Sequence, residues 1–269
     1  MSEVIGNLVC EVRGGMGLIT LNRPRALNAL SLQMVRELTA TLLRWVDDDA
    51  VQAVALRGMG KEGPFGAFCA GGDIRFFHQA ALAGNPELED FFTEEYALNH
   101  LVHRYPKPYV VFMDGIVMGG GMGIAGHGAA GSLRIATPRT KMAMPETNIG
   151  LFPDVGGGWF LSRCPGAIGE YLALTGEVIG ATDAVVAGLA DGVLPEVELT
   201  DAWEQLATQG AAAVTSLRDR LAGQHESADA ALAKHRPEID RFFSLPDVPT
   251  IVRALEGEGS EWASRTAAV

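Results

Sequence analysis

The chain has 269 residues, of which 48% are hydrophobic and 20% are charged, and its formal net charge at pH 7 is -12. The composition is typical of a globular protein with a substantial core, and the length suits one large domain or a domain with an appendage. The acidic charge argues against nucleic acid as a partner. No apolar run is long enough to cross a membrane, so we expect no membrane partner.

The cysteines and the N-terminal residues indicate where in the cell the protein is located. Cys10, Cys69 and Cys164 are odd in number and follow no disulfide or metal-binding spacing. The first residues, MSEVIGNLVCEV, lack the basic region and apolar block of a signal peptide. We therefore expect a cytoplasmic protein without disulfides.

The first sixty residues predict two strands, a helix and a third strand. Residues 8–13 and 17–22 flank a Gly-Gly turn and indicate a hairpin. Apolar residues recur at helical spacing over 32–47, with Ser31 as the predicted N-cap. The apolar run 51–57 predicts the third strand.

The rest of the chain predicts an α/β core followed by helices. The expected strands are 109–113, 133–136, 141–143 and 192–194, and the expected helices of the core are 74–83, 87–105, 168–175 and 182–189. A Gly/Ala-rich segment from 114 to 131 predicts a helix packed closely against its neighbours. After residue 195 only helical patterns remain, at 201–209, 211–221 and 228–243. We expect a core of repeated strand-strand-helix units over 1–195 and a helical region over 196–269.

The stretch Met144–Phe160, MPETNIGLFPDVGGGWF, is the first candidate for chemistry. It places Glu146 and Asp154 eight residues apart among apolar, Gly and Pro residues. A carboxylate is costly to bury in such surroundings unless it is paired, hydrogen-bonded or used in a reaction. The alternative, that both side chains only cap turns, stays open.

Two glycine-rich turns, Cys69–Asp73 and Met118–Gly121, each follow a strand and precede a predicted helix. Glycine permits close approach of a ligand to the backbone, and a helix N-terminus offers unpaired N–H groups. The two turns suggest an oxyanion hole, in which one well-placed donor contributes about 3–4 kcal/mol. Neither turn has dinucleotide-binding or P-loop spacing, and the sequence has no GxSxG elbow. We expect no metal site, since His100 and His103 are more readily read as core or solvated histidines.

At these positions the chain resembles a known family. The segments AFCAGGDI (67–74), DGIVMGGGMGI (114–124) and MPETNIGLFPDVGGG (144–158) are similar to the crotonase, or enoyl-CoA hydratase/isomerase, superfamily. Within it they look most like the 3-hydroxyisobutyryl-CoA hydrolase branch, and the resemblance covers about residues 8–195. It implies a crotonase-like spiral of ββα units and an acyl-CoA substrate, with no further cofactor because coenzyme A enters with the substrate. It also implies a homo-oligomer, a trimer or hexamer.

The resemblance also assigns roles to residues. Gly72 and Gly120 would donate their backbone N–H groups to the thioester oxygen. Glu146 would attack the thioester carbon or activate water, and Asp154 would orient the substrate hydroxyl or the water. The remaining substrate-binding residues implied by the motifs line the acyl pocket or cradle the nucleotide and pantetheine: Glu95, Arg25, Ala26, Leu27, Gly71, Asp73, Ile74 and Gly119.

Several reactions remain open at this stage. Hydratases of the family need two glutamates; the second aligns with Glu146, but the first falls at Gly123. Dienoyl-CoA isomerases use a Glu and an Asp, and a non-catalytic acyl-CoA binding protein is a further alternative. The setting FPDVGGGWF and the sequence Glu94-Glu95-Tyr96 favour a 3-hydroxyisobutyryl-CoA hydrolase of valine catabolism. Hydrolases of this branch usually continue past the position of Val269, so we expect this chain to be either a shorter or a truncated variant.

Overall fold

A seven-stranded sheet forms the centre of the computed structural model, which describes residues 3–129, 131–224 and 230–269. Its strand order is β1-β2-β3-β4-β5-β7-β9, antiparallel from β1 to β3 and parallel from β3 onward. The strands are β1 (Glu3–Ile5), β2 (Leu8–Arg13), β3 (Met16–Leu21), β4 (Ala53–Gly58), β5 (Tyr109–Met113), β7 (Leu133–Ala136) and β9 (Gly192–Val193). All residues of β3 and β5 are buried, which fits continuous apolar runs with covered faces.

A second, smaller sheet runs alongside the first. It contains β6 (Ile116–Met118) and β8 (Lys141–Ala143), which pair in parallel. Single bridges extend it on both sides, joining Leu30 to Gly72, Cys69 to Val117, and Met142 to Ile179. Each repeat of the spiral therefore adds one strand to the large sheet and one short extended segment to the small sheet. This is the repeated strand-strand-helix spiral that the sequence predicts.

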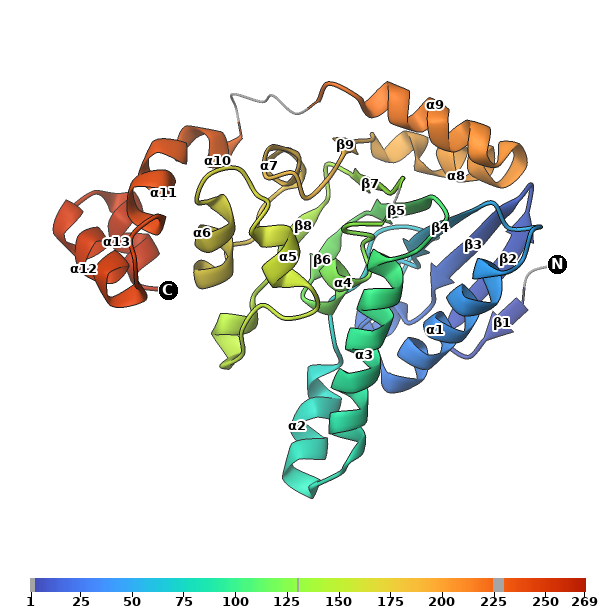
Figure 1. Ribbon diagram of the computed structural model, residues 1–269, viewed down its shortest axis with the longest axis horizontal. Coiled ribbons are helices and arrows are strands. Elements are labelled where there is room, and N and C mark those ends of the chain that lie inside the picture. The colour runs from blue at the N-terminus through green and yellow to red at the C-terminus, as the bar shows by residue number, and fades with distance from the viewer. Residues whose placement is uncertain (1–2, 130, 225–229) are drawn as a thin grey trace.

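Helices cover both faces of the large sheet (Figure 1). On one face α1 (Leu32–Val46) packs against α3 (Glu87–His103), which forms a projecting hairpin with α2 (Ile74–Ala83). Ser31 caps α1 through its hydroxyl, which accepts from the Met34 N–H at 3.2 Å. On the opposite face α8 (Leu199–Gln209) and α9 (Ala211–Leu221) form a second core with the outward side chains of β3, β4, β5 and β7.

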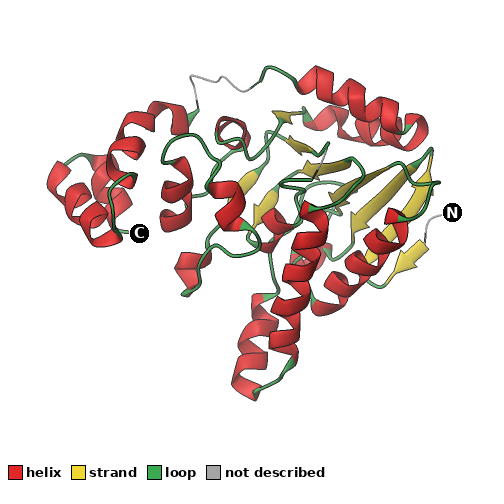
Figure 2. Cartoon of the chain, viewed as in Figure 1, coloured by secondary structure: helices red, strands yellow, loops and turns green. Residues whose placement is uncertain are grey.

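The remaining helices follow β6, lie between β8 and β9, or belong to the C-terminal region. They are α4 (Gly120–Gly123), α5 (Gly157–Leu161), α6 (Ile168–Thr175), α7 (Ala181–Val186), α10 (Ala231–Lys234), α11 (Arg236–Phe243), α12 (Val248–Glu258) and α13 (Glu261–Ala267), with 3-10 turns η1 (Pro24–Ala26), η2 (Glu146–Ile149) and η3 (Glu196–Glu198). Helices α10 to α13 gather beside α6 and α7, and Figure 2 shows no strand among the described residues after β9. The helical C-terminal region is therefore present, while the domain boundary at residue 195 stays a prediction.

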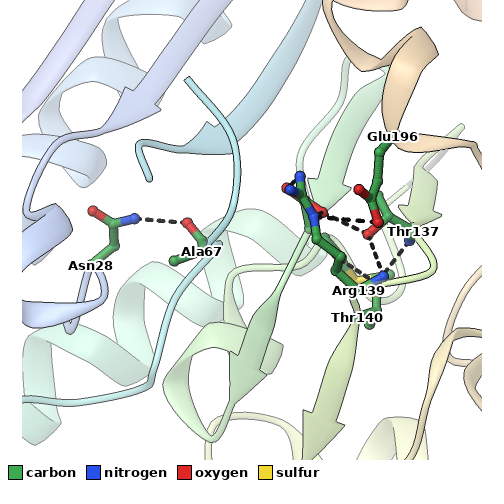
Figure 3. Close-up of polar contacts among 8 residues, drawn as sticks. Asn28, Ala67, Thr137, Arg139, Thr140 and Glu196 are labelled. Atoms are coloured by element: carbon green, nitrogen blue, oxygen red, sulfur yellow. Dashed lines mark hydrogen bonds and ion pairs between the residues drawn. The ribbon is translucent and has the colours of Figure 1, made fainter. Parts of the chain in front are cut away.

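Buried polar contacts tie the ends of these elements together (Figure 3). Asp114 is 2% exposed, accepts from the Thr137 hydroxyl at 2.6 Å, and is paired with Arg139 at 2.6 Å. Arg139 also lies 3.5 Å from Glu196, at the start of the C-terminal helices. Elsewhere in the same view, the Asn28 amide donates to the carbonyl of Ala67 at 2.8 Å. These contacts hold together the loops that follow β3, β4, β5 and β7.

The structure corrects two of the predicted helices and adds one that was not predicted. The Gly/Ala-rich segment from 114 to 131 contains only the four-residue helix α4, preceded by β6, and residue 130 lies outside the described residues. The predicted helix 228–243 is divided into α10 and α11 because Pro237 lies in the first turn of α11; residues 228 and 229 lie outside the described part. The end of the Met144–Phe160 stretch, for which no helix was predicted, forms the short helix α5, whose Phe160 and Leu161 are buried.

Candidate active site

The first glycine-rich turn is held in place by backbone hydrogen bonds to the segment after η1. Ala70 N–H donates to the Leu27 carbonyl at 3.0 Å, Leu30 N–H to the Gly71 carbonyl at 2.8 Å, and Asp73 N–H to the Leu30 carbonyl at 3.0 Å. Within the described part of the chain, the N–H of Gly72 has no acceptor. The turn therefore presents one rigid, unpaired donor.

The second turn ends at the N-terminus of α4. Gly119 adopts φ 48° and ψ -118°, and its N–H donates to the Ala143 carbonyl at 3.1 Å. Gly120 begins the helix, so its N–H has no intrahelical acceptor, and no other described residue accepts from it. A Cβ atom placed on Gly120 would lie 3.4 Å from the Gly72 nitrogen, and one on Gly71 would lie 3.4 Å from the Gly120 nitrogen. The two unpaired amides thus lie side by side, the arrangement that stabilises a developing oxyanion.

Three carboxylates surround this pair of amides. Glu146 comes from η2, directly after β8, Glu95 comes from α3, and Asp154 lies in the loop before α5. Glu146 and Glu95 are only 6% and 2% exposed. A Cβ atom on Gly119 would lie 2.6 Å from Glu146 Oε1, and one on Gly120 would contact Glu95 Oε1. Both glutamates therefore lie directly against the second turn.

All three carboxylates and both glycine turns line one cavity of about 60 Å³. Gly71, Gly119 and Ile74 line it as well, together with apolar residues of the Met144–Phe160 stretch. No Lys or Arg is among its described lining residues. The cavity therefore combines hydrogen-bond donors with an uncompensated excess of acidic groups.

Burial and mutual repulsion raise the pKa values of these acids. Burial raises the pKa of Glu146 to about 7, and the charge of Asp154 adds to the shift. Burial raises the pKa of Glu95 to about 8, with the charges of Asp154 and Glu146 contributing. The Tyr96 hydroxyl donates to Asp154 Oδ2 at 2.6 Å. Near neutral pH the site can therefore hold both a proton acceptor and a protonated acid.

Four of the predicted substrate-binding residues, Arg25, Ala26, Leu27 and Asp73, do not line this cavity. Arg25 and Ala26 are in η1, and Leu27 follows it in the left-handed region at φ 50°. The Asp73 side chain caps α2 through the Phe76 N–H and accepts from Arg23 at 3.0 Å. Both oxygens of the Asp73 carboxylate therefore already accept hydrogen bonds from the protein. We expect Asp73 to contact a substrate through its backbone. The roles of these residues stay predictions.

Sequence analysis used Tyr96 only as part of a motif, without a role of its own, and did not single out Asn99. Asn99 follows Glu95 by one helical turn, a spacing that could have flagged it, whereas the Tyr96–Asp154 contact joins distant segments. A Cβ atom on Gly123 would lie 2.6 Å from Asn99 Nδ2 and 2.8 Å from the Val155 Cβ. The space for any side chain at position 123 is therefore filled. Val155 itself has φ 44°, an unusual conformation for a β-branched residue next to Asp154.

Two further types of site can be assessed in the described part of the chain. No group of three or more His, Cys, Asp or Glu side chains there is arranged to hold a metal ion. No described helix is long and apolar enough to span a membrane. The three cysteines are free and buried, and burial raises the pKa of Cys69 to about 12.

Comparison with known proteins places the chain in a family. Residues 16–269 match the family model described as enoyl-CoA hydratase/isomerase. The chain is 42% identical over 264 residues to the mitochondrial 3-hydroxyisobutyryl-CoA hydrolase of Xenopus tropicalis, covering 96% of this chain and 67% of that protein. It is 38% identical over 268 residues to the human protein of the same name, covering 97% and 68%.

Solved structures agree with this relationship. A carnitinyl-CoA dehydratase from Mycobacterium thermoresistibile is 40% identical, with a TM-score of 0.87, over 98% of this chain and 74% of that one. An enoyl-CoA hydratase from Rhodobacter sphaeroides is 35% identical, with a TM-score of 0.82, over 98% and 73%. The chain has the α/β crotonase fold with a C-terminal helical region. It is a member of the crotonase, or enoyl-CoA hydratase/isomerase, family.

Proposed function

We propose that this protein is an acyl-CoA thioester hydrolase that acts on 3-hydroxyisobutyryl-CoA, the short β-hydroxyacyl thioester of valine catabolism. One observation carries the proposal: Glu146, Asp154 and the unpaired amides of Gly72 and Gly120 share one cavity, while position 123 has no room for a second glutamate. The related hydrolases at about 40% identity support the same substrate.

The reaction follows from the chemistry of these groups. The thioester oxygen accepts from the N–H groups of Gly72 and Gly120, which stabilise the negative charge of a tetrahedral intermediate. Ionised Glu146 takes a proton from water as the water oxygen attacks the thioester carbon, or its carboxylate attacks that carbon directly. In the first case the carbon–sulfur bond then breaks, and the departing thiolate of coenzyme A takes the proton from Glu146. In the second case the carbon–sulfur bond breaks to leave an anhydride between the acyl group and Glu146, and the thiolate takes a proton from solvent. Water then hydrolyses the anhydride, which regenerates Glu146 and releases the hydroxy acid. The products are free coenzyme A and the hydroxy acid.

Asp154 has a separate role in this scheme. Its Oδ2 accepts from the Tyr96 hydroxyl, which orients the carboxylate toward the cavity that it lines. The second oxygen is then free to accept the β-hydroxyl of the substrate. This contact would distinguish a hydroxyacyl thioester from an unsubstituted one, because a site built for a hydroxyl rejects an analogue that lacks it.

A second candidate is a hydratase or dienoyl-CoA isomerase of the same family. The observation in its favour is that Glu146 and Asp154 both line the cavity and could exchange a proton through a bound substrate. The third alternative, a non-catalytic acyl-CoA binding protein, would leave the raised pKa values of two buried glutamates without use.

We also propose a homo-oligomer, a trimer or hexamer, and a cytoplasmic location, although the named relatives are mitochondrial.

The deciding experiment measures free coenzyme A released from 3-hydroxyisobutyryl-CoA, beside hydration of crotonyl-CoA by the same preparation. Thiol release without hydration supports the hydrolase, whereas hydration without thiol release refutes it. Glu146→Gln and Asp154→Asn should each lower kcat by about 100-fold or more. Glu94→Gln is the matched control, because Glu94 is paired with Arg36 on the outer side of α3 and should not affect turnover.

A further inference from the structure

The direction of the Gly72 N–H is determined by the peptide unit that it shares with the Gly71 carbonyl. This carbonyl accepts from the Leu30 N–H at 2.8 Å, and Leu30 and Gly72 form a parallel bridge. A trans peptide unit is planar, with its carbonyl and its N–H on opposite sides, so a fixed carbonyl also fixes the N–H. The direction of the candidate oxyanion donor therefore depends on the position of Leu30.

The backbone before Leu30 is held by the side chain of Asn28. Asn28 is fully buried, and its Oδ1 accepts from the Arg23 N–H at 2.8 Å. Its Nδ2 donates to the Met59 carbonyl at 3.0 Å and to the Ala67 carbonyl at 2.8 Å, and Figure 3 shows the second of these bonds. The side chain thus joins the segment after β3 to the loop that leads from β4 into the first glycine-rich turn.

The backbone at Asn28 has an unusual conformation that these bonds maintain. Leu27 and Asn28 have φ values of 50° and 55°, and two consecutive residues other than glycine in the left-handed region are costly. The sharp turn brings the Leu27 carbonyl to the Ala70 N–H at 3.0 Å. The Asn28 carbonyl accepts from the Cys69 thiol at 3.2 Å. Without the side-chain bonds of Asn28, we expect this turn to relax and Leu30 to move with it.

Arg23 holds the same segment through its guanidinium. Nη1 donates to the Ala29 carbonyl at 2.5 Å, and Nη2 donates to Asp73 Oδ2 at 3.0 Å. The Asp73 N–H donates to the Leu30 carbonyl at 3.0 Å. Arg23 therefore joins the residue before Leu30 to the residue after Gly72, on both sides of the hydrogen bond that directs the candidate donor.

We propose that Asn28 and Arg23 are positioning residues for thioester hydrolysis, because together they direct the Gly72 N–H toward the thioester oxygen. Neither side chain lines the cavity, so both act through the glycine turn and not by touching the substrate. The inference rests on the proposed function in that the carbonyl binds at Gly72 and Gly120. A donor stabilises an oxyanion best when it already points to the oxygen, so loss of this direction should lower kcat more than it raises KM.

The test measures the carbonyl stretching frequency of a bound ketone analogue, in which a methylene group replaces the thioester sulfur of 3-hydroxyisobutyryl-CoA. Hydrogen bonds from an oxyanion hole polarise the carbonyl and lower this frequency, so infrared difference spectroscopy reports the direction of the donors without turnover. Asn28→Gly tolerates the left-handed backbone and removes all three side-chain bonds. Arg23→Met removes the bonds to Ala29 and Asp73.

Each variant should reduce the wild-type frequency shift by about half or more, and lower kcat by about tenfold or more with KM changed by less than about threefold. Thr140→Val is the matched control. Thr140 is buried, and its hydroxyl donates to the Met113 carbonyl at 2.6 Å and accepts from the Thr137 N–H at 2.8 Å, in the second group of contacts in Figure 3. Its loss should lower the melting temperature and leave the frequency shift unchanged.

The spectroscopic result separates this inference from the proposed function. If both variants bind the analogue with the wild-type shift, the inference is overturned, whether or not the protein is a hydrolase. If wild type releases no coenzyme A but both variants reduce the shift, the hydrolase proposal fails and the positioning roles stand. An unshifted frequency in wild type would overturn the inference as well. Where circular dichroism shows that Asn28→Gly does not fold, the result for Arg23→Met decides.

Discussion

Replacing Glu95 by glutamine should stabilise the fold above neutral pH and leave its stability unchanged in acid. Glu95 is 2% exposed on α3, Oε1 has no partner among the described residues, and burial raises its pKa from 4.5 to about 8. Between these two values the folded protein binds a proton at this position that the unfolded chain releases. The free energy of unfolding therefore falls as the pH rises from about 4.5 to about 8, and stays lower above that range.

The size of the stabilisation by Glu95→Gln follows from the shift in the pKa of Glu95. Each pKa unit corresponds to about 1.4 kcal/mol, so the full difference between 4.5 and about 8 amounts to about 5 kcal/mol at most. Water entry and side-chain movement reduce the cost of an ionised Glu95, so we expect about 2–4 kcal/mol. Glutamine has the shape of the protonated acid and cannot ionise. The variant should match wild type at pH 5 and exceed its stability by this amount at pH 9.

Urea unfolding at a series of pH values from 5 to 9 measures the difference directly. Glu94→Gln is the neighbouring control, because Glu94 is exposed and its pKa is lowered by the hydrogen bonds from Arg36. It should show no alkaline stabilisation. Parallel pH curves for wild type and Glu95→Gln would refute the reasoning, because they would mean that Glu95 is ionised throughout the range in the folded protein.

Three further predictions concern activity. The kcat/KM for thiol release should rise with pH through about 7 as Glu146 ionises, and a pH–rate profile without an inflection there would contradict its role. Gly120→Ala should lower kcat by about 100- to 1,000-fold, measured by steady-state kinetics, because the new methyl group would contact Glu95 and crowd the oxyanion position. Tyr96→Phe removes the 2.6 Å hydrogen bond to Asp154 and should lower kcat/KM for a hydroxyacyl thioester by about 10- to 100-fold. An equal loss on an unsubstituted acyl thioester would argue against this orienting role.

The sequence predicted the regular elements well where one local period determined them. The strand Tyr109–Met113 and the helix Ile74–Ala83 have the expected bounds, since a continuous apolar run and a capped amphipathic pattern depend only on neighbouring residues. The bounds of α4, which lies within a much longer predicted helix, and the existence of α5 could not be obtained in this way. Both occur in glycine-rich segments, where packing against the core overrides the low helix propensity of glycine.

The parts of the site that lie within one motif could also be found from sequence. Two carboxylates in an apolar stretch and two glycine turns stand out by composition alone. The contacts of Tyr96 with Asp154, and of Asn99 with Gly123, join residues of α3 to segments that follow much later in the chain. Only the spiral, which brings α3 beside α4 and the loop before α5, creates them.

The acidity of the cavity has a direct bearing on how an oxyanion could form there. Glu95 Oε1 lies against Gly120, so a negative charge on that carboxylate would oppose the charge that develops on a thioester oxygen bound to the same turn. The pKa of about 8 removes this conflict, because Glu95 is mostly protonated at pH 7. Burial raises the pKa of Glu146 less, to about 7, so this carboxylate ionises at a lower pH than Glu95. Because Glu146 ionises before Glu95, one cavity can hold an ionised base beside an oxyanion site. Raising the pH far enough to ionise Glu95 should make Glu146 fully ionised but weaken the binding of an oxyanion at Gly120.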